Sequence, residues 1–145
     1  MELNGLPQVD AWCADLGSFD LRTFMLSNVS IAEACSVIAL MSPGFVEYRG
    51  CIFLDFVFDA SGVDAWIDRF DGVEQSVESA VNHVHLWDFF SPKSEAENDA
   101  LVELAHRMVE SWKSSALMQF PGREFVVQFS DGSDDYGPTL VIYAG

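Results

Sequence analysis

A long amphipathic helix near the carboxyl end of the chain is the feature that most constrains its fold. Segment 94–117 starts with Ser94 and carries Glu97 three residues later, the pattern of a capping box. Apolar side chains then recur at helical spacing, at Leu101, Leu104, Ala105, Met108 and Trp112. Acidic residues fill the first turns and Lys113 lies near the end, the order that the helix dipole favours. The apolar stripe needs a surface to pack against, and we expect the remaining segments to provide it.

A β-hairpin is predicted directly after this helix. Pro121 and Gly122 break the chain, and two apolar segments follow at 124–129 and 139–143. The polar loop 130–138 joins them. The chain is therefore expected to end in a pair of antiparallel strands.

Segment 45–58 carries the strongest strand signal, because apolar residues alternate along it. Gly50 lies in its middle and predicts a bulge, a bend or the turn of a tight hairpin, since glycine weakens a regular strand. Segment 81–87 predicts a further strand. Segment 19–26, with Phe19, Leu21 and Thr23 on one face if extended, is also predicted as a half-buried strand.

Two more helices are indicated by capping signals. Ser30 and Glu33 form a capping box that predicts a helix over 30–41. A second start signal at 61–64 predicts a short helix that Gly72 ends. Its apolar face carries Val63, Trp66, Ile67 and Phe70. Segment 73–80 is compatible with strand, helix or loop.

These elements predict one α+β domain over residues 1–145. Hairpins are frequent and crossovers are few, so we expect a mostly antiparallel sheet of five or six strands. Two to three helices would pack on one face of that sheet, and the chain would end in a β-hairpin. Strand order does not follow from the sequence.

The chain is strongly acidic but not disordered in composition. It has 23 Asp and Glu against 7 Lys and Arg, a formal net charge of −16 at pH 7, and 50% apolar residues. Twelve Phe and four Trp are enough apolar surface for a packed core. An acidic surface repels phosphate and anionic lipid, so nucleic-acid and membrane partners are disfavoured and a cationic partner is favoured.

The cysteines and the amino terminus favour a cytoplasmic protein. Cys13, Cys35 and Cys51 are odd in number and far apart, which predicts reduced thiols rather than disulfides or a zinc ribbon. The first residues lack the basic stretch and apolar run of a secretory signal. Apolar runs are far shorter than the ~20 residues that span a bilayer. No cofactor motif is present, and in particular no phosphate-binding glycine loop.

Two patterns suggest metal binding. His83 and His85 share one face of an extended segment, and Asp88 lies close in sequence, so these three residues are a candidate metal site. In loop 130–138 the residues Asp131, Ser133 and Asp135 match the first ligand positions of a calcium loop. The match to the calcium loop then stops. The more ordinary interpretation of the histidine pair is a solvated or half-buried sheet face, and that of the acidic loop is a polar turn.

The leading hypothesis is a protein-interaction module that binds a basic protein, in the manner of an immunity protein or an inhibitor of a toxin. Complementary charge would raise the association rate and a few aromatic side chains would supply most of the affinity. The candidate contact residues lie on one helix, on the segment after it and in the last loop: Asp64, Asp68, Asp71, Glu74, Glu78, Asp131, Asp134, Asp135 and Tyr136.

The sequence also allows two alternatives. One is a small metal-dependent enzyme that uses His83, His85 and Asp88. The other is an acidic homodimer, or another homo-oligomer, which resembles the chaperones of type III secretion in size and charge. Those chaperones typically end in a helix, whereas this chain is predicted to end in a strand.

Overall fold

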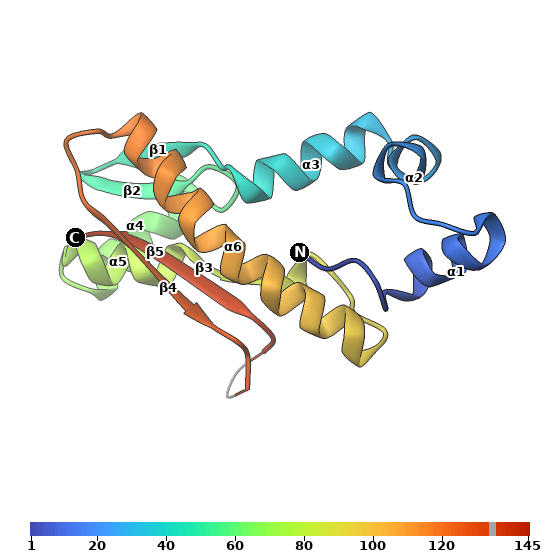
Figure 1. Cartoon of the computed structure of the whole chain (residues 1–145). Helices are drawn as coiled ribbons and strands as arrows, with labels where there is room; N and C mark the ends of the chain where they lie inside the picture. Colours follow the sequence, from blue (N-terminus) through green and yellow to red (C-terminus); the bar gives the residue numbers. More distant parts are fainter. Residues whose placement is uncertain (134–135) are drawn as a thin grey trace.

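The computed structural model describes residues 1–133 and 136–145, and within them the chain has an α+β architecture (Figure 1). Its six α-helices are α1 (Pro7–Leu16), α2 (Leu21–Asn28), α3 (Ile31–Met41), α4 (Ala60–Arg69), α5 (Glu74–Val81) and α6 (Glu95–Gln119). Its strands are β1 (Phe45–Tyr48), β2 (Cys51–Leu54), β3 (His83–His85), β4 (Phe125–Ser130) and β5 (Thr139–Ala144). A single 3-10 turn, η1 (Leu86–Asp88), follows β3.

The long helix and the final hairpin are confirmed. Ser94 caps α6 by accepting the N–H of Glu97 at 3.2 Å, and β4 pairs with β5 antiparallel from Phe125–Ala144 to Ser130–Thr139. Together with β3 they form a three-stranded sheet in the order β3-β5-β4. The apolar stripe of α6 packs against this sheet with Ala105, Met108 and Trp112 fully buried.

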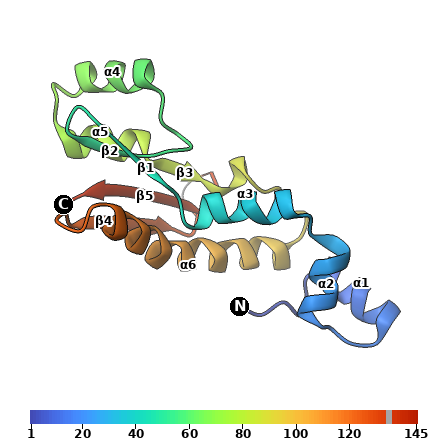
Figure 2. The same ribbon diagram turned by 90° about the horizontal axis from the view of Figure 1, so that it is seen from above.

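The prediction of one large sheet is wrong, because β1 and β2 form a separate two-stranded sheet. The strand signal at 45–58 is interrupted by a turn at Arg49 and Gly50, whose φ angles are both positive, at 51° and 83°. Such a two-residue turn matches the twist of a hairpin, so of the three interpretations of Gly50 the tight hairpin is the one observed. The helices also do not share one face: α6 lies on one side of the three-stranded sheet, and α4 and α5 lie on the other (Figure 2).

Two buried polar side chains, Glu78 in α5 and Asn82 directly after it, join the two sheets. Glu78 accepts the N–H of Ile52 in β2 at 2.8 Å and that of Ala144 in β5 at 2.6 Å. Asn82 accepts the N–H of Leu54 at 2.9 Å and donates to the carbonyl oxygens of Ile52 and Ile142. If β2 and β5 paired directly, their backbone N–H and C=O groups would bond each other. Here the side chains of Glu78 and Asn82 bond those groups instead. This is why two small sheets exist where the strand signals predicted one.

Helices α1 and α2 lie away from both sheets, beyond the outer end of α3 (Figure 1). Helix α1 was not predicted, and segment 19–26 is mostly helix α2 rather than a strand. Asp20 caps α2 by accepting the N–H of Thr23 at 2.9 Å, a signal that the apparent alternation concealed. The capping box of Ser30 and Glu33 at the start of α3 is confirmed, with both of its hydrogen bonds present.

The remaining helices differ from expectation at their ends. Helix α4 starts two residues early, because Asp59 rather than Ser61 is the cap and accepts the N–H of Gly62 at 2.8 Å. The open segment 73–80 is helix α5. Among the residues that the structure describes, no single helix is long and apolar enough to cross a membrane; α2 and α3 reach that length and composition only as a pair, bent by 109°.

Candidate protein-interaction surface

The predicted contact residues fall into two separate groups in the structure. Asp64 and Asp68 lie on α4, Asp71 lies in the turn after it, and Glu74 begins α5. Asp131 and Tyr136 belong to the loop between β4 and β5. That loop lies at the opposite end of the hairpin from the carboxyl terminus, near which α5 packs (Figure 1). Asp134 and Asp135 lie outside the described residues.

The α4 group is less acidic than its sequence suggests. Asp64 is bonded by the hydroxyl of Tyr48 at 3.1 Å and forms an ion pair with Arg49 at 3.3 Å. Arg69 also lies on α4, with its guanidinium 5.3 Å from the centre of the Trp66 ring. Two arginines therefore balance part of the negative charge at this group, which weakens its attraction for a cation.

Glu78 is not part of any contact surface, which corrects the prediction. Its side chain is only 1% exposed because it bonds the backbones of β2 and β5. Burial raises the pKa of the Glu78 carboxyl above its ordinary value, although the N–H groups of Ala144 and Ile52 oppose that shift. Its role in the structure is to connect the two sheets.

The loop group is centred on two exposed aromatic rings. Trp87 is 39% exposed and Tyr136 is 53% exposed, and their rings meet edge to face at 5.3 Å. The His85 ring lies 5.8 Å from that of Tyr136, and the Nδ1 atom of His85 donates to the Tyr136 carbonyl oxygen at 3.1 Å. Trp87 and Tyr136 line a small hollow of about 200 Å³ together with Phe90, Ser91 and Pro92. These residues form what we call the aromatic surface.

The local backbone holds the two rings in place. Gly137 has a positive φ of 68°, and a side chain there would meet the Trp87 ring at 2.5 Å. Only glycine allows the loop to lie directly on the indole ring. On the other side, Nε1 of Trp87 donates to the side-chain oxygen of Asn98 in α6 at 3.3 Å. Trp87 is therefore fixed between the loop and α6 while part of its ring remains exposed.

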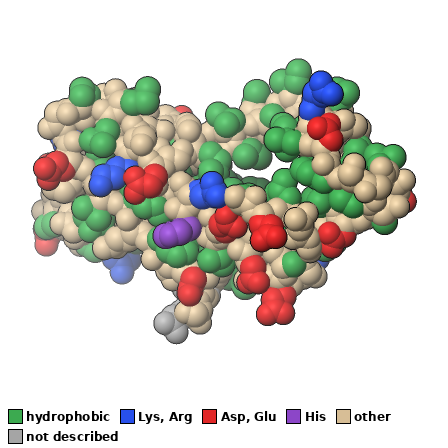
Figure 3. Space-filling model, in the orientation of Figure 1, with side chains coloured by type: hydrophobic (Ala, Val, Ile, Leu, Met, Phe, Trp, Pro, Cys, Tyr) green, Lys and Arg blue, Asp and Glu red, His purple; other side chains and the backbone are tan. Residues whose placement is uncertain are grey.

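Exposed carboxylates lie close in the chain to the residues of the aromatic surface. Asp88 follows Trp87 directly and is exposed, as is Asp131 in the loop. The Ser133 backbone N–H donates to Asp131 at 2.9 Å and lowers the pKa of that carboxyl, so it stays ionised at neutral pH. Glu95 and Asp99 are exposed in the first turns of α6, next to Asn98. Figure 3 shows acidic side chains gathered over this half of α6.

The predicted metal trio does not form a site. The rings of His83 and His85 stack at 4.5 Å, but across residues 1–133 and 136–145 no three His, Cys, Asp or Glu side chains are grouped so that they could hold a metal ion. Asp88 lies in η1, where the chain leaves the extended conformation. The change of direction after His85 is the physical reason that Asp88 does not join the two histidines.

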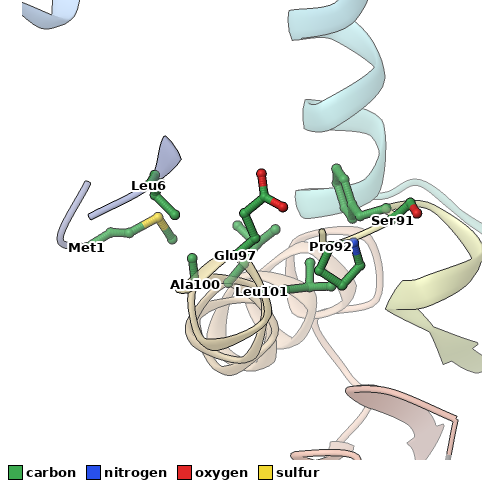
Figure 4. Close-up of a pocket in the computed structure, with 9 residues that line it drawn as sticks. Met1, Leu6, Ser91, Pro92, Glu97, Ala100 and Leu101 are labelled. Carbon is green, nitrogen blue, oxygen red and sulfur yellow. The ribbon is translucent and has the colours of Figure 1, made fainter. Parts of the chain in front are cut away.

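A more apolar hollow of about 310 Å³ lies where the amino terminus returns to α6 (Figure 4). Its walls include Met1, Leu6, Pro92 and Leu101. Among its described lining residues, Glu97 has the one charged side chain, and its carboxylate accepts the N–H of Lys93 at 2.6 Å. Met1 also carries the amino-terminal ammonium group, which pairs with Glu103 at 3.5 Å.

Of the residues at or beside the aromatic surface, the sequence analysis named Tyr136 and Asp131 as candidates and did not name Trp87 or Asn98. A tryptophan within an apolar segment predicts core, and its exposure depends on where η1 turns the chain. Comparison of the chain with protein-family models, with curated proteins and with solved structures found no match.

Proposed function

We propose that this protein binds a basic protein partner through the aromatic surface, as an inhibitor or immunity protein covers the cationic site of a toxin. The observation that carries the proposal is the exposed pair Trp87 and Tyr136, whose rings are held together. Exposed carboxylates lie near both residues in the chain, with Asp88 next to Trp87 and Asp131 in the same loop as Tyr136. Aromatic side chains in such a position supply most of the affinity in many interfaces.

The electrostatics of the aromatic surface favour a cationic occupant. Lys or Arg of a partner can lie over the face of an indole or phenol ring and gain about 0.5–2 kcal/mol. Asp88 and Asp131 would steer the partner at a distance, an effect that salt weakens. The chain's net charge of −16 acts in the same direction.

The aromatic surface is a better candidate than the α4 group for a physical reason. At α4, Arg49 already occupies Asp64 and Arg69 covers the Trp66 ring. A cationic partner docking there would meet two like charges. Among the described residues that line the hollow of the aromatic surface there is no Lys or Arg, and the nearest in sequence is Lys93, which follows Pro92.

The test is capture from a lysate of the source cells at low and at high salt, with the captured protein identified and then purified. Titration of that protein should show Trp87→Ala raising Kd by about 30-fold or more, which is the effect of losing a hot-spot side chain. Trp87→Phe should recover part of the loss, since it keeps an aromatic ring.

The matched control compares two exposed carboxylates. Asp131→Asn, beside the aromatic surface, should slow association about two- to three-fold at low salt, whereas Asp68→Asn on α4 should leave it unchanged. A partner of neutral or acidic pI, or one that binds Trp87→Ala as well as wild type, would contradict the proposal.

A further inference from the structure

Helix α3 exposes an apolar stripe that no other part of the described chain covers. Ile31 is 84% exposed and Ile38 is 61% exposed, and Cys35 between them is also exposed. With Ala34 these residues occupy positions i, i+3, i+4 and i+7, so they lie on one side of the helix. A surface helix of a folded protein normally packs such a stripe against a partner.

The carboxyl end of α3 is fixed to the rest of the molecule, which holds the stripe in a defined place. Nε1 of Trp112 donates to the Leu40 carbonyl oxygen at 2.8 Å, and the Ser42 and Ser111 hydroxyls lie 3.1 Å apart. Figures 1 and 2 show α3 reaching outward from this point to α2. The stripe itself therefore faces away from the rest of the chain and is open to another molecule.

The charge pattern favours a second copy of the chain over a basic partner. From Thr23 to Val46 the only charged residue is Glu33. Two copies of a protein with a net charge of −16 repel each other wherever acidic faces meet. The surface of α3 and of the part of α2 that follows Arg22 is the region where they can approach with little repulsion, and Glu33 is the one carboxylate that it offers to a cation.

The stripe is also complementary to itself. Its side chains follow the order large, small, small, large, because Ile31 and Ile38 flank Ala34 and Cys35. If two α3 helices meet antiparallel across a two-fold axis between positions 34 and 35, each Ile31 contacts the partner's Ile38. The small residues at the centre let the helix axes approach to about 8 Å. A two-fold interface requires this kind of self-match.

Exposed apolar side chains of α2 extend the stripe of α3. Leu21, Met25 and Leu26 of α2 are 56%, 43% and 86% exposed. A standard interface buries roughly 800 Å² on each partner, so part of α2 is expected to contribute beside α3. We propose that α3 and the neighbouring part of α2 form a homodimer interface in which the α3 helices pack antiparallel about a two-fold axis.

The experiment measures mass in solution by light scattering and sedimentation across a range of protein concentrations. Wild type should show a species of about twice 16.1 kDa. Ile38→Glu should raise the dimer Kd by about 100-fold or more, because it places two carboxylates in an apolar interface. Met118→Glu, which changes an equally apolar residue that is 84% exposed on α6, should dimerise as wild type does. Circular dichroism and Tm of the variants establish that each is folded.

Cys35 provides a second readout that needs no loss of folding. A short bifunctional thiol reagent should link two chains through Cys35, and Cys35→Ser should abolish the linked species whereas Cys13→Ser should not. A monomer at all concentrations, or a dimer that Ile38→Glu and Cys35→Ser leave unchanged, would overturn the proposal. Binding of monomeric wild type to neutral phosphatidylcholine vesicles, lost in Ile38→Glu, would assign the stripe to lipid and overturn it as well.

Discussion

Helices α3 and α6 have similar sequence signals but opposite surroundings. Each begins at a serine that caps the helix, Ser30 in α3 and Ser94 in α6, and each has apolar residues at helical spacing. In α6 the stripe is buried against the three-stranded sheet, with Trp112 at 0% exposure. In α3 the stripe through Ile31 and Ile38 faces outward. The comparison teaches that periodicity shows which side of a helix will pack, while only the rest of the fold decides whether the chain itself supplies the partner.

The largest effect that tests this comparison comes from removing one large apolar side chain from each helix. Trp112→Ala should lower the free energy of unfolding by about 3–5 kcal/mol, because it leaves a cavity and removes a hydrogen bond to Leu40. Ile38→Ala should change the stability of the monomer by less than about 0.5 kcal/mol. Urea unfolding at low protein concentration measures both. Similar losses in the two variants would mean that the α3 stripe is packed within the monomer.

Helix α5 is the reverse of α3: a charged residue, Glu78, is buried there, whereas α3 exposes apolar residues. Glu78→Ala would leave the N–H groups of Ile52 and Ala144 without an acceptor. Each buried donor left unsatisfied costs about 1–3 kcal/mol, so a total loss of about 3 kcal/mol is expected in urea unfolding. Glu74→Ala, an exposed acid in the same helix, is the control and should lie within about 0.5 kcal/mol of wild type. Equal stability of the two variants would contradict the structural role of Glu78.

The charge on Glu78 should also give stability a distinct pH dependence. Burial raises its pKa in the folded state above the ordinary 4.5, so the folded protein holds this proton more tightly than the unfolded chain does. The favourable contribution is present below pH 4.5 and is lost as pH rises through the raised pKa. The stability of wild type relative to Glu78→Gln should therefore fall as pH rises above 4.5.

The difference between the two proteins isolates Glu78 from the exposed acids. Asp20 and Asp59 have lowered pKa values because backbone and side-chain groups donate to them, and their contributions are lost as pH falls instead. Those contributions are the same in wild type and in Glu78→Gln and cancel. A relative stability that rises with pH would mean that the two N–H bonds outweigh burial.

Local signals predicted local structure well in this chain. The capping box of α3, the serine cap and apolar stripe of α6, and the turn at Gly50 each depend on neighbours within a few residues, and each is observed. The capping box predicted at Ser94 is only half formed, because the Glu97 carboxylate accepts the N–H of Lys93 instead of that of Ser94. What the sequence could not provide was long-range pairing. The bonds of Glu78 and Asn82 span 26 to 66 residues, and they decide that β2 and β5 do not pair directly. Segment 19–26 shows the limit of periodicity, since a short alternation competed with the cap at Asp20 and the cap prevailed.

The exposure of some candidate surface residues follows from local sequence, and that of others does not. Asp131 and Tyr136 lie in a polar loop, and a polar loop is expected to be exposed. Trp87 is brought to the surface by η1 and by the close approach of Gly137. Neither feature has a marker in the sequence around Trp87, so its exposure follows only from the folded chain.

The smallest expected effect on stability comes from removing the capping serines of α3 and α6. Ser94→Ala and Ser30→Ala each remove a hydroxyl that accepts an N–H three residues on, a loss of about 1 kcal/mol in a helix. In α6 the loss should appear in full in global unfolding, because α6 forms the core with the sheet. In α3 it should appear as faster hydrogen exchange within residues 31–41, with a smaller change in global stability, because much of this helix packs on little else in the monomer. If exchange in α3 were slowed again at high protein concentration, dimerisation would be protecting the helix, and the two caps would then become equivalent.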